Sequence, residues 1–101
     1  MGVRSRSSLP TASNQYGLSI STSAVSLTVP RAAMVGEIYV RTASIVFKRD
    51  TGTPTATEGF QADPSDIILL NSRAELDGFR AVRQAGTDAT VDVEYFTDVS
   101  G

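Results

Sequence analysis

The stretch ATVDVEY at residues 89–95 decides the fold, because its apolar and polar residues alternate strictly along the chain. One phase of this alternation is apolar and consists of Ala89, Val91, Val93 and Tyr95. Successive side chains of a β-strand point to opposite faces of its sheet, so the pattern predicts a half-buried strand. The other phase carries Asp92 and Glu94, and with Asp88 it forms an acidic stripe. We expect this stripe to be the solvated face of an edge strand.

Shorter runs of the same kind lie upstream of this stretch. Alternation or short apolar runs predict strands near 18–20, 25–29, 38–40, 45–47, 67–70 and 80–84, the run 67–70 being a buried one. The apolar phase flips between 38–40 and 45–47, which favours a tight hairpin at 42–44. Turn residues separate the runs at intervals of about ten residues, a spacing typical of β-sandwiches and jelly rolls. The sequence therefore predicts an all-β sandwich of jelly-roll type with about seven or eight short strands.

One short helix is expected within this β-rich chain. Ser72 and Glu75 are spaced as a capping box, in which a serine side chain and a glutamate three residues later satisfy the first amides of a helix. The predicted helix spans residues 73–79. Upstream of it, Phe60 stands alone in polar sequence and is expected to pin a long loop to the core.

The domain organisation follows from length and patterning. A chain of 101 residues is long enough for one hydrophobic core, and we assign residues 16–101 to a single domain. Residues 1–15 are polar and lack periodicity, which predicts an extended N-terminal arm. A polar arm has no core of its own, so it is either a disordered tail or an arm that lies on a neighbouring subunit or another protein, and we expect the second.

Composition excludes several classes of chemistry. The sequence contains neither histidine nor cysteine, so Ser-His-Asp and Cys-His catalysis, thiolate metal sites and histidine metal sites are excluded. A two-carboxylate glycosidase needs no histidine but needs a long cleft, for which the domain is small. Asp63 and Asp66 are interpreted as turn residues rather than calcium ligands. We expect no enzyme activity, no cofactor, no metal and no small-molecule substrate.

The distribution of charge leaves two interpretations open: the charges of the two halves mix on the surface of one sandwich, or a basic face of one subunit meets an acidic face of the next. The net charge is −2, but residues 1–50 carry +4 and residues 51–101 carry −6. Eight of the nine basic residues are arginine, which tolerates interfaces better than lysine. No dense basic cluster is present, so nucleic acid is not an expected partner. No apolar run approaches the length needed to cross a membrane, so no membrane association is expected.

Residues 39–96 resemble a family of small tailed-bacteriophage virion proteins. The resemblance is carried by the segments RDTGTPTA at 49–56, LDGFRAVR at 76–83 and DATVDVEY at 88–95, together with the apolar run that precedes Ser72. Proteins of this kind are similar to capsid decoration or cement proteins. The resemblance implies a jelly-roll-like sandwich, often a homotrimer, that binds the major capsid protein on the head surface and stabilises the lattice. It also implies localisation to the virion, after assembly in the host cytoplasm.

Interface residues can be proposed on the arm and on the sandwich. Arg4 and Arg6 are the arm residues expected to contact acidic groups of the capsid, and Glu37, Asp92 and Glu94 are weaker candidates on the sandwich. A tail, head-fibre or head–tail joining component would have a similar composition and remains an alternative. A carbohydrate-binding adhesin module is a further alternative, with Tyr39, Tyr95 and Phe96 as a possible platform, although tryptophan is absent.

Overall fold

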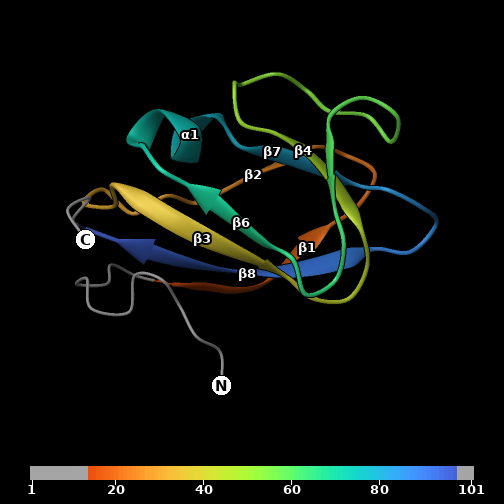
Figure 1. Cartoon of the computed structure of the whole chain (residues 1–101), viewed down its shortest axis with the longest axis horizontal. Helices are drawn as coiled ribbons and strands as arrows, with labels where there is room; N and C mark the ends of the chain where they lie inside the picture. The colour runs from red at the N-terminus through yellow and green to blue at the C-terminus, as the bar shows by residue number, and fades with distance from the viewer. Residues whose placement is uncertain (1–13, 98–101) are drawn as a thin grey trace.

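The computed structural model describes residues 14–97, which form a sandwich of two antiparallel sheets with one short helix (Figure 1). This confirms the all-β expectation. The strands are Gln15–Ile20 (β1), Val25–Ser26 (β2), Val35–Val40 (β3), Ile45–Lys48 (β4), Phe60–Ala62 (β5), Ile67–Leu70 (β6), Arg80–Arg83 (β7) and Ala89–Phe96 (β8). Residues 1–13, with Arg4 and Arg6, lie outside the described residues. The sheet takes up Gln15, which the sequence assigned to the arm.

The strand order is that of a jelly roll. One sheet has the order β1-β8-β3-β6 and the other has the order β2-β7-β4-β5. The first strand therefore pairs with the last, the second with the seventh, the third with the sixth and the fourth with the fifth. This nesting is what results when a long antiparallel hairpin rolls into two packed sheets.

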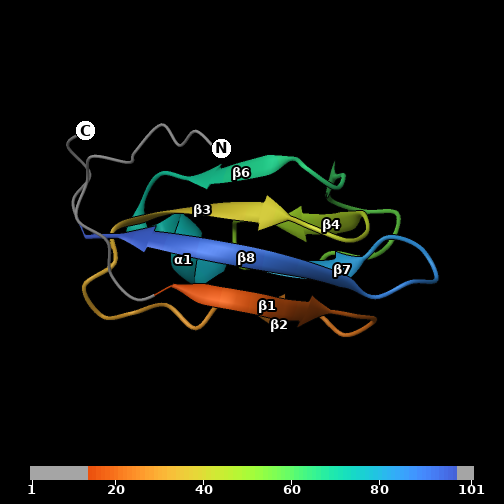
Figure 2. The same cartoon turned by 90° about the horizontal axis from the view of Figure 1, so that it is seen from below.

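Strand β8 lies in the interior of its sheet, between β1 and β3 (Figure 2). The expectation of an edge strand is therefore wrong, although the alternation itself is correct. Val91, Val93 and Tyr95 are almost fully buried in the core between the sheets. The polar phase faces outward from the sandwich and is flanked on both sides by strands, so Glu94 is only 7% exposed.

The core fills the space between the two sheets. Ile38 and Val91 from one sheet meet Ile45 and Phe47 from the other, and Phe79 closes the end beside the helix. The ring of Phe47 stacks on that of Phe79 with their centroids 5.7 Å apart. The apolar phases read from the sequence therefore mark the inward faces.

The predicted hairpin at 42–44 is wrong, because β3 and β4 belong to different sheets. Residues 41–44 carry the chain from one layer across to the other. The two sheets face each other, so the side of a strand that points into the core reverses when the chain passes from one sheet to the other. Ile38 and Ile45 are therefore both buried in the core although they belong to opposite phases of the alternation. The change of apolar phase between 38–40 and 45–47 thus results from the passage of the chain from one sheet to the other.

Two apolar segments lie nearer the surface than predicted. Strand β6 is at the edge of its sheet, and while Ile68 and Leu70 are buried, Ile67 and Leu69 are 47% and 40% exposed. Phe60 belongs to edge strand β5 and is 63% exposed, so it does not pin a loop to the core. A run without polar residues shows no alternation, which is why burial on both faces was predicted for 67–70.

The helix α1 spans Arg73–Gly78 and confirms the capping prediction. The amide of Glu75 donates to Oγ of Ser72 at 3.2 Å, and Oε1 of Glu75 accepts from the amide of Asn71 at 2.7 Å. The Glu75 carboxylate thus accepts from the residue before the N-cap and not from the N-cap itself. Within residues 14–97 no helix has the length and apolar character needed to cross a membrane.

Candidate functional site

The outward face of the β1-β8-β3-β6 sheet brings together most of the sequence-predicted site residues that the structure describes. The β3–β8 register sets Glu37 directly opposite Glu94 and Tyr39 directly opposite Asp92. On the other side of β3, Tyr39 is opposite Ile67. The face therefore carries carboxylates, an aromatic ring and an aliphatic side chain in adjacent rows.

Glu37 and Glu94 are buried within this face. Their exposed fractions are 1% and 7%, and the hydroxyl of Tyr39 donates to Oε1 of Glu37 at 2.8 Å. Both glutamates make further interactions. Their burial disfavours the prediction that they contact a second protein, because a partner would have to reach groups that the protein already encloses.

Asp92 on β8 links its strand to β1 and to the residue that follows β3. Its Oδ1 accepts from the amide of Gly17 at 2.8 Å, and its Oδ2 pairs with Nη1 of Arg41 at 2.7 Å. Gly17 has φ of +65°, a conformation that glycine adopts without strain, and it lies where the β1–β8 register shifts. Asp92 therefore fixes a bulge in β1.

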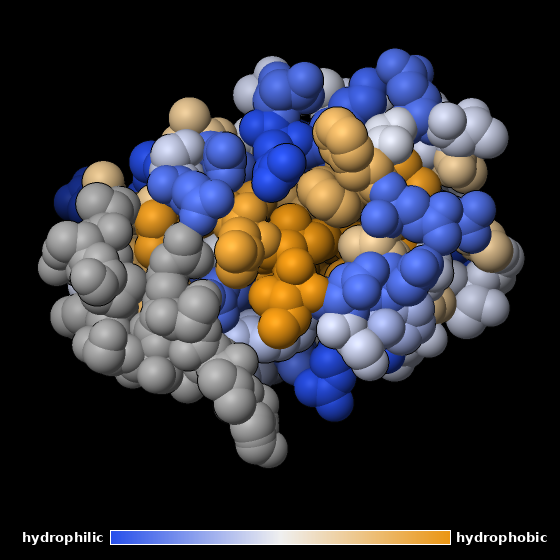
Figure 3. All heavy atoms as spheres, in the orientation of Figure 1, coloured by the Kyte–Doolittle hydropathy of each residue, from blue (hydrophilic) through white to orange (hydrophobic). Residues whose placement is uncertain are grey.

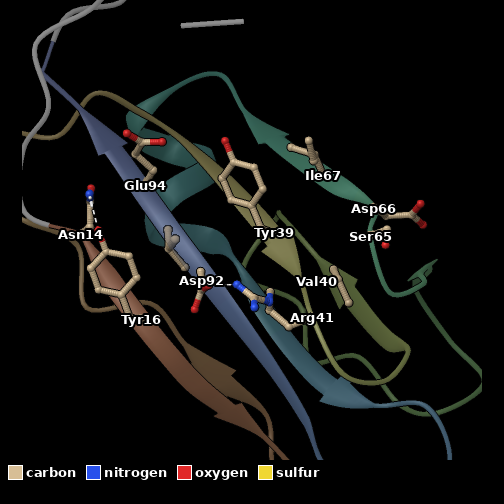
Figure 4. A pocket seen from close by; sticks show the side chains of 11 residues that line it. Asn14, Tyr16, Tyr39, Val40, Arg41, Ser65, Asp66, Ile67, Asp92 and Glu94 are labelled. Atoms are coloured by element: carbon tan, nitrogen blue, oxygen red, sulfur yellow. Dashed lines mark hydrogen bonds and ion pairs between the residues drawn. The ribbon is translucent and has the colours of Figure 1, made fainter. Parts of the chain in front are cut away.

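A groove of about 580 Å³ opens on the same face (Figure 4). Tyr16 and Asn14 stand at one side, Asp66 and Ile67 at the other, and Tyr39 lies between them. Tyr16 is 74% exposed, which makes it the most accessible aromatic side chain in the described part of the chain. The groove combines an exposed ring with charged groups and is open to solvent.

The aromatic platform predicted from Tyr39, Tyr95 and Phe96 does not form. Tyr95 and Phe96 are 1% and 0% exposed, and only Tyr39 lines the groove. The hydroxyl of Tyr95 donates to Oε1 of Gln15 at 2.9 Å, and burial raises the pKa of Tyr95 to about 12. Tyr16 was missed because nothing in its neighbourhood distinguished an exposed tyrosine from a buried one.

The acids Asp63 and Asp66 organise a turn, as the sequence predicted. Oδ2 of Asp66 accepts from the amide of Asp63 at 2.8 Å, while Oδ1 of Asp63 accepts from Gln61 and Ser44. These side-chain hydrogen bonds, first that of Gln61 and then that of Ser44, hold the pKa of Asp63 below its ordinary value. Among residues 14–97 no group of acids is arranged to hold a metal ion.

A second surface lies at the edge formed by β5 and β6, which we call the β5–β6 edge. It carries the exposed side chains of Phe60, Ile67 and Leu69, and a hollow of about 340 Å³ opens between the two strands. Figure 3 shows apolar side chains gathered in the middle of this side of the molecule. Sequence reasoning missed this surface because it assigned both segments to the interior.

Arg49 lies along the β5–β6 edge. Its Nη1 donates to the carbonyl oxygen of Leu69 at 3.3 Å, and its guanidinium lies 5.8 Å from the centre of the Phe47 ring. A cation over an aromatic face is favourable and holds the guanidinium beside the apolar surface. This edge thus combines exposed apolar side chains, the backbone of two outermost strands and one arginine.

Comparison with protein-family models, with curated protein sequences and with solved structures finds no match. The description of the fold and of the two surfaces therefore comes from the residues of this chain alone.

Proposed function

We propose that this chain is a virion structural protein of the capsid decoration or cement type, which binds the major capsid protein on the head surface. The observation that carries the proposal is the β5–β6 edge, where Ile67, Leu69 and Phe60 are exposed on a sandwich without histidine or cysteine. Exposed apolar side chains beside an open strand suit association with another protein. The resemblance over residues 39–96 supplies the class of partner.

A role in binding rather than catalysis is supported by how the acids of the groove are used. Both oxygens of Asp92 are engaged, by Gly17 and by Arg41. Glu37 and Glu94 are buried. A general acid or base must reach its substrate, so these contacts favour structural duties for the carboxylates.

The arm supplies a second part of the proposed contact. Residues 1–13 are polar and contain Arg4 and Arg6 as their only charged side chains. An arm of this charge complements an acidic capsid surface, and it precedes β1 at the rim of the sandwich. For the oligomer the resemblance implies a trimer, whereas the open edge of β6 supports a different contact, described below.

Binding to capsids assembled without this protein tests the proposal. The full-length chain is expected to co-sediment with such capsids saturably, at a copy number that matches the capsid subunit. Absence of binding would overturn the proposal, and saturation at a few copies per particle would replace it by a tail, head-fibre or head–tail joining role.

The role of the arm has a matched control. Replacing Arg4 and Arg6 together by alanine is expected to weaken co-sedimentation. Arg31→Ala, which removes an exposed arginine from the sandwich, is expected to leave it unchanged. If all variants bind as the unaltered chain does, the arm has no part in the contact.

A carbohydrate-binding module is the second candidate, and the groove favours it. Tyr16 offers an exposed ring, and Arg41 and Asp66 supply polar groups at the same opening. Sugars bind by stacking on such rings and by hydrogen bonds to charged side chains. Saturable binding on a glycan array that Tyr16→Ala abolishes would support this role, and an array without binding would reject it.

A further inference from the structure

Strand β6 has one backbone edge without a strand partner among the described residues. It is the last strand of the order β1-β8-β3-β6 and pairs only with β3. The amide of Val40 donates to the carbonyl oxygen of Asp66 at 3.0 Å, so Val40 directs its backbone groups toward β6. In an antiparallel pair such bonds recur at alternate residues, which places Ile68 and Leu70 in the bonded positions.

It follows that the amides and carbonyls of Ile67 and Leu69 point away from β3, toward the open side. The contact between Nη1 of Arg49 and the carbonyl oxygen of Leu69 agrees with this direction, because that carbonyl can be reached only from outside the sheet. The bond is long, at 3.3 Å, and a carbonyl oxygen has a second lone pair. A further strand can therefore bond to both positions.

The β6 edge lacks the features that keep the edges at β1 and β2 from pairing. Strand β1, at the opposite edge, is interrupted by its bulge at Gly17, and β2 is only two residues long. Residues 67–70 contain no charge, proline or glycine and no register shift against β3. Edge strands without such features are the ones that associate.

The pattern of the β6 edge is complementary to itself. Two antiparallel copies of β6 related by a two-fold axis at Ile68 bring Ile67 of each copy opposite Leu69 of the other. These are the two positions whose backbone groups point outward, so each can exchange both hydrogen bonds. The same register sets the exposed Ile67 and Leu69 side chains against each other on the outer face.

Charge complementarity favours the same arrangement. The guanidinium of Arg49 lies at the Leu69 end of the edge, and the carboxylate of Asp66 directly precedes Ile67 at the other end. The two-fold axis therefore brings Arg49 of one copy beside Asp66 of the other, twice. Asp66 uses one carboxylate oxygen, Oδ2, for the amide of Asp63, which leaves Oδ1 to receive the arginine.

We propose that two copies of this chain associate by antiparallel pairing of their β6 strands about Ile68, joining their β1-β8-β3-β6 sheets into one continuous sheet. This contact can form without the proposed virion function, but it occupies Ile67 and Leu69, so in a dimer the proposed capsid contact would rest on Phe60 and the arm. It predicts a dimer in solution in place of the trimer that the resemblance implies. The same edge of each copy is used up in a two-fold contact, so no further copy can be added through it.

Sedimentation equilibrium of the full-length chain at concentrations up to about 1 mM tests the pairing, since an interface of this small size is expected to be weak. A monomer–dimer equilibrium is expected. A monomer at every concentration, or a trimer, would overturn the proposal.

Substitutions in β6 test whether this strand forms the dimer contact. Leu69→Lys is expected to weaken dimerisation by roughly thirtyfold or more, because it places a charge at the centre of the contact in both copies. Ile67→Pro removes an amide that points away from β3 and is expected to act in the same way. Tyr16→Lys, which adds a charge at the opposite edge, is the matched control and should not change the equilibrium.

A charge reversal tests the Arg49–Asp66 contact. Arg49→Glu alone is expected to weaken the dimer, and Arg49→Glu combined with Asp66→Arg is expected to restore it. Circular dichroism of each variant shows that the sandwich is formed. A folded Leu69→Lys or Ile67→Pro chain that dimerises as the unaltered chain does would overturn the proposal.

Discussion

At the residue scale, Arg73 holds the long connection between β2 and β3 against the helix. Its Nη1 lies 2.9 Å from each of the carbonyl oxygens of Pro30, Arg31 and Ala33, and its Nε donates to Oδ2 of Asp77 at 3.2 Å. A guanidinium can satisfy several carbonyls at once because its donors lie in a fixed plane. The sequence showed this residue only as the first position of a helix.

Arg73→Ala is expected to lower the free energy of unfolding by about 1–3 kcal/mol, because partly buried carbonyl groups lose their donor. Chemical denaturation measures the change. Arg41→Ala, which removes a pair whose arginine side chain is 61% exposed, should cost less than about 1 kcal/mol. Equal losses for the two variants would contradict this assignment.

The carboxylates of Asp63 and Asp88 link stability to pH. The hydroxyl of Ser21 and then the guanidinium of Arg83 hold the pKa of Asp88 below its ordinary value, and hydrogen bonds do the same for Asp63. A depressed pKa in the folded state contributes stability that is present above the unfolded pKa and is lost as the pH falls through the folded pKa.

We therefore expect the melting temperature to fall as the pH drops below about 4. Asp88→Asn should lower the melting temperature at neutral pH and flatten this acid dependence, as should Ser21→Ala through the same hydrogen bond. Scanning calorimetry as a function of pH measures both effects. An acid dependence that is unchanged in Asp88→Asn would refute the assignment.

At the element scale, the end of α1 is set by close packing against the loop after β4. A Cβ atom at Gly78 would lie 2.7 Å from the carbonyl oxygen of Arg49 and 3.1 Å from the amide nitrogen of Thr51. That amide donates to the carbonyl oxygen of Gly78 at 3.0 Å, so the two segments are joined where they approach most closely. Glycine is required here for space and not for its dihedral freedom.

Gly78→Ala is expected to destabilise the protein by roughly 1–3 kcal/mol, because both clashing atoms belong to the backbone and cannot turn aside. Gly86→Ala is the matched control, since no atom lies within 4 Å of the Cβ position there. Its stability should change by less than about 1 kcal/mol. Thermal melts of the two variants distinguish them, and equal melting temperatures would contradict the packing argument.

At the scale of the whole molecule, the chain's first and last strands depend on each other. Strand β8 pairs with β1 on one side and with β3 on the other, so the sheet lacks its middle until the end of the chain is in place. Pairings this distant in sequence make folding slow, because loop closure precedes the gain from contacts.

A chain that ends at residue 88 is therefore expected to be unfolded, whereas a chain that begins at residue 14 retains every strand and is expected to fold. Refolding of the full chain should take on the order of milliseconds to seconds. Circular dichroism and stopped-flow refolding measure these outcomes. A cooperative melt of the chain without β8 would show that the jelly roll forms without its central strand.

The sequence by itself determined the short helix, the strands other than β5 and the inward phase of those strands in which apolar and polar residues alternate, because alternation, capping and turn residues act over a few neighbouring positions. Val91 and Val93 were assigned to the core and Ser72 to the N-cap for this reason, and both assignments are confirmed. The absence of histidine and cysteine likewise limits the chemistry of the chain, because it is a property of composition and holds for any fold.

Only the tertiary structure decided which strands lie at an edge and which side chains remain accessible. Strand β8 was expected at an edge and lies inside a sheet, while 67–70 was expected inside and forms an edge. The burial of Glu94 and the exposure of Ile67 follow from that reversal. Strand order arises from pairings between residues far apart in the chain, and no local pattern of side chains encodes it.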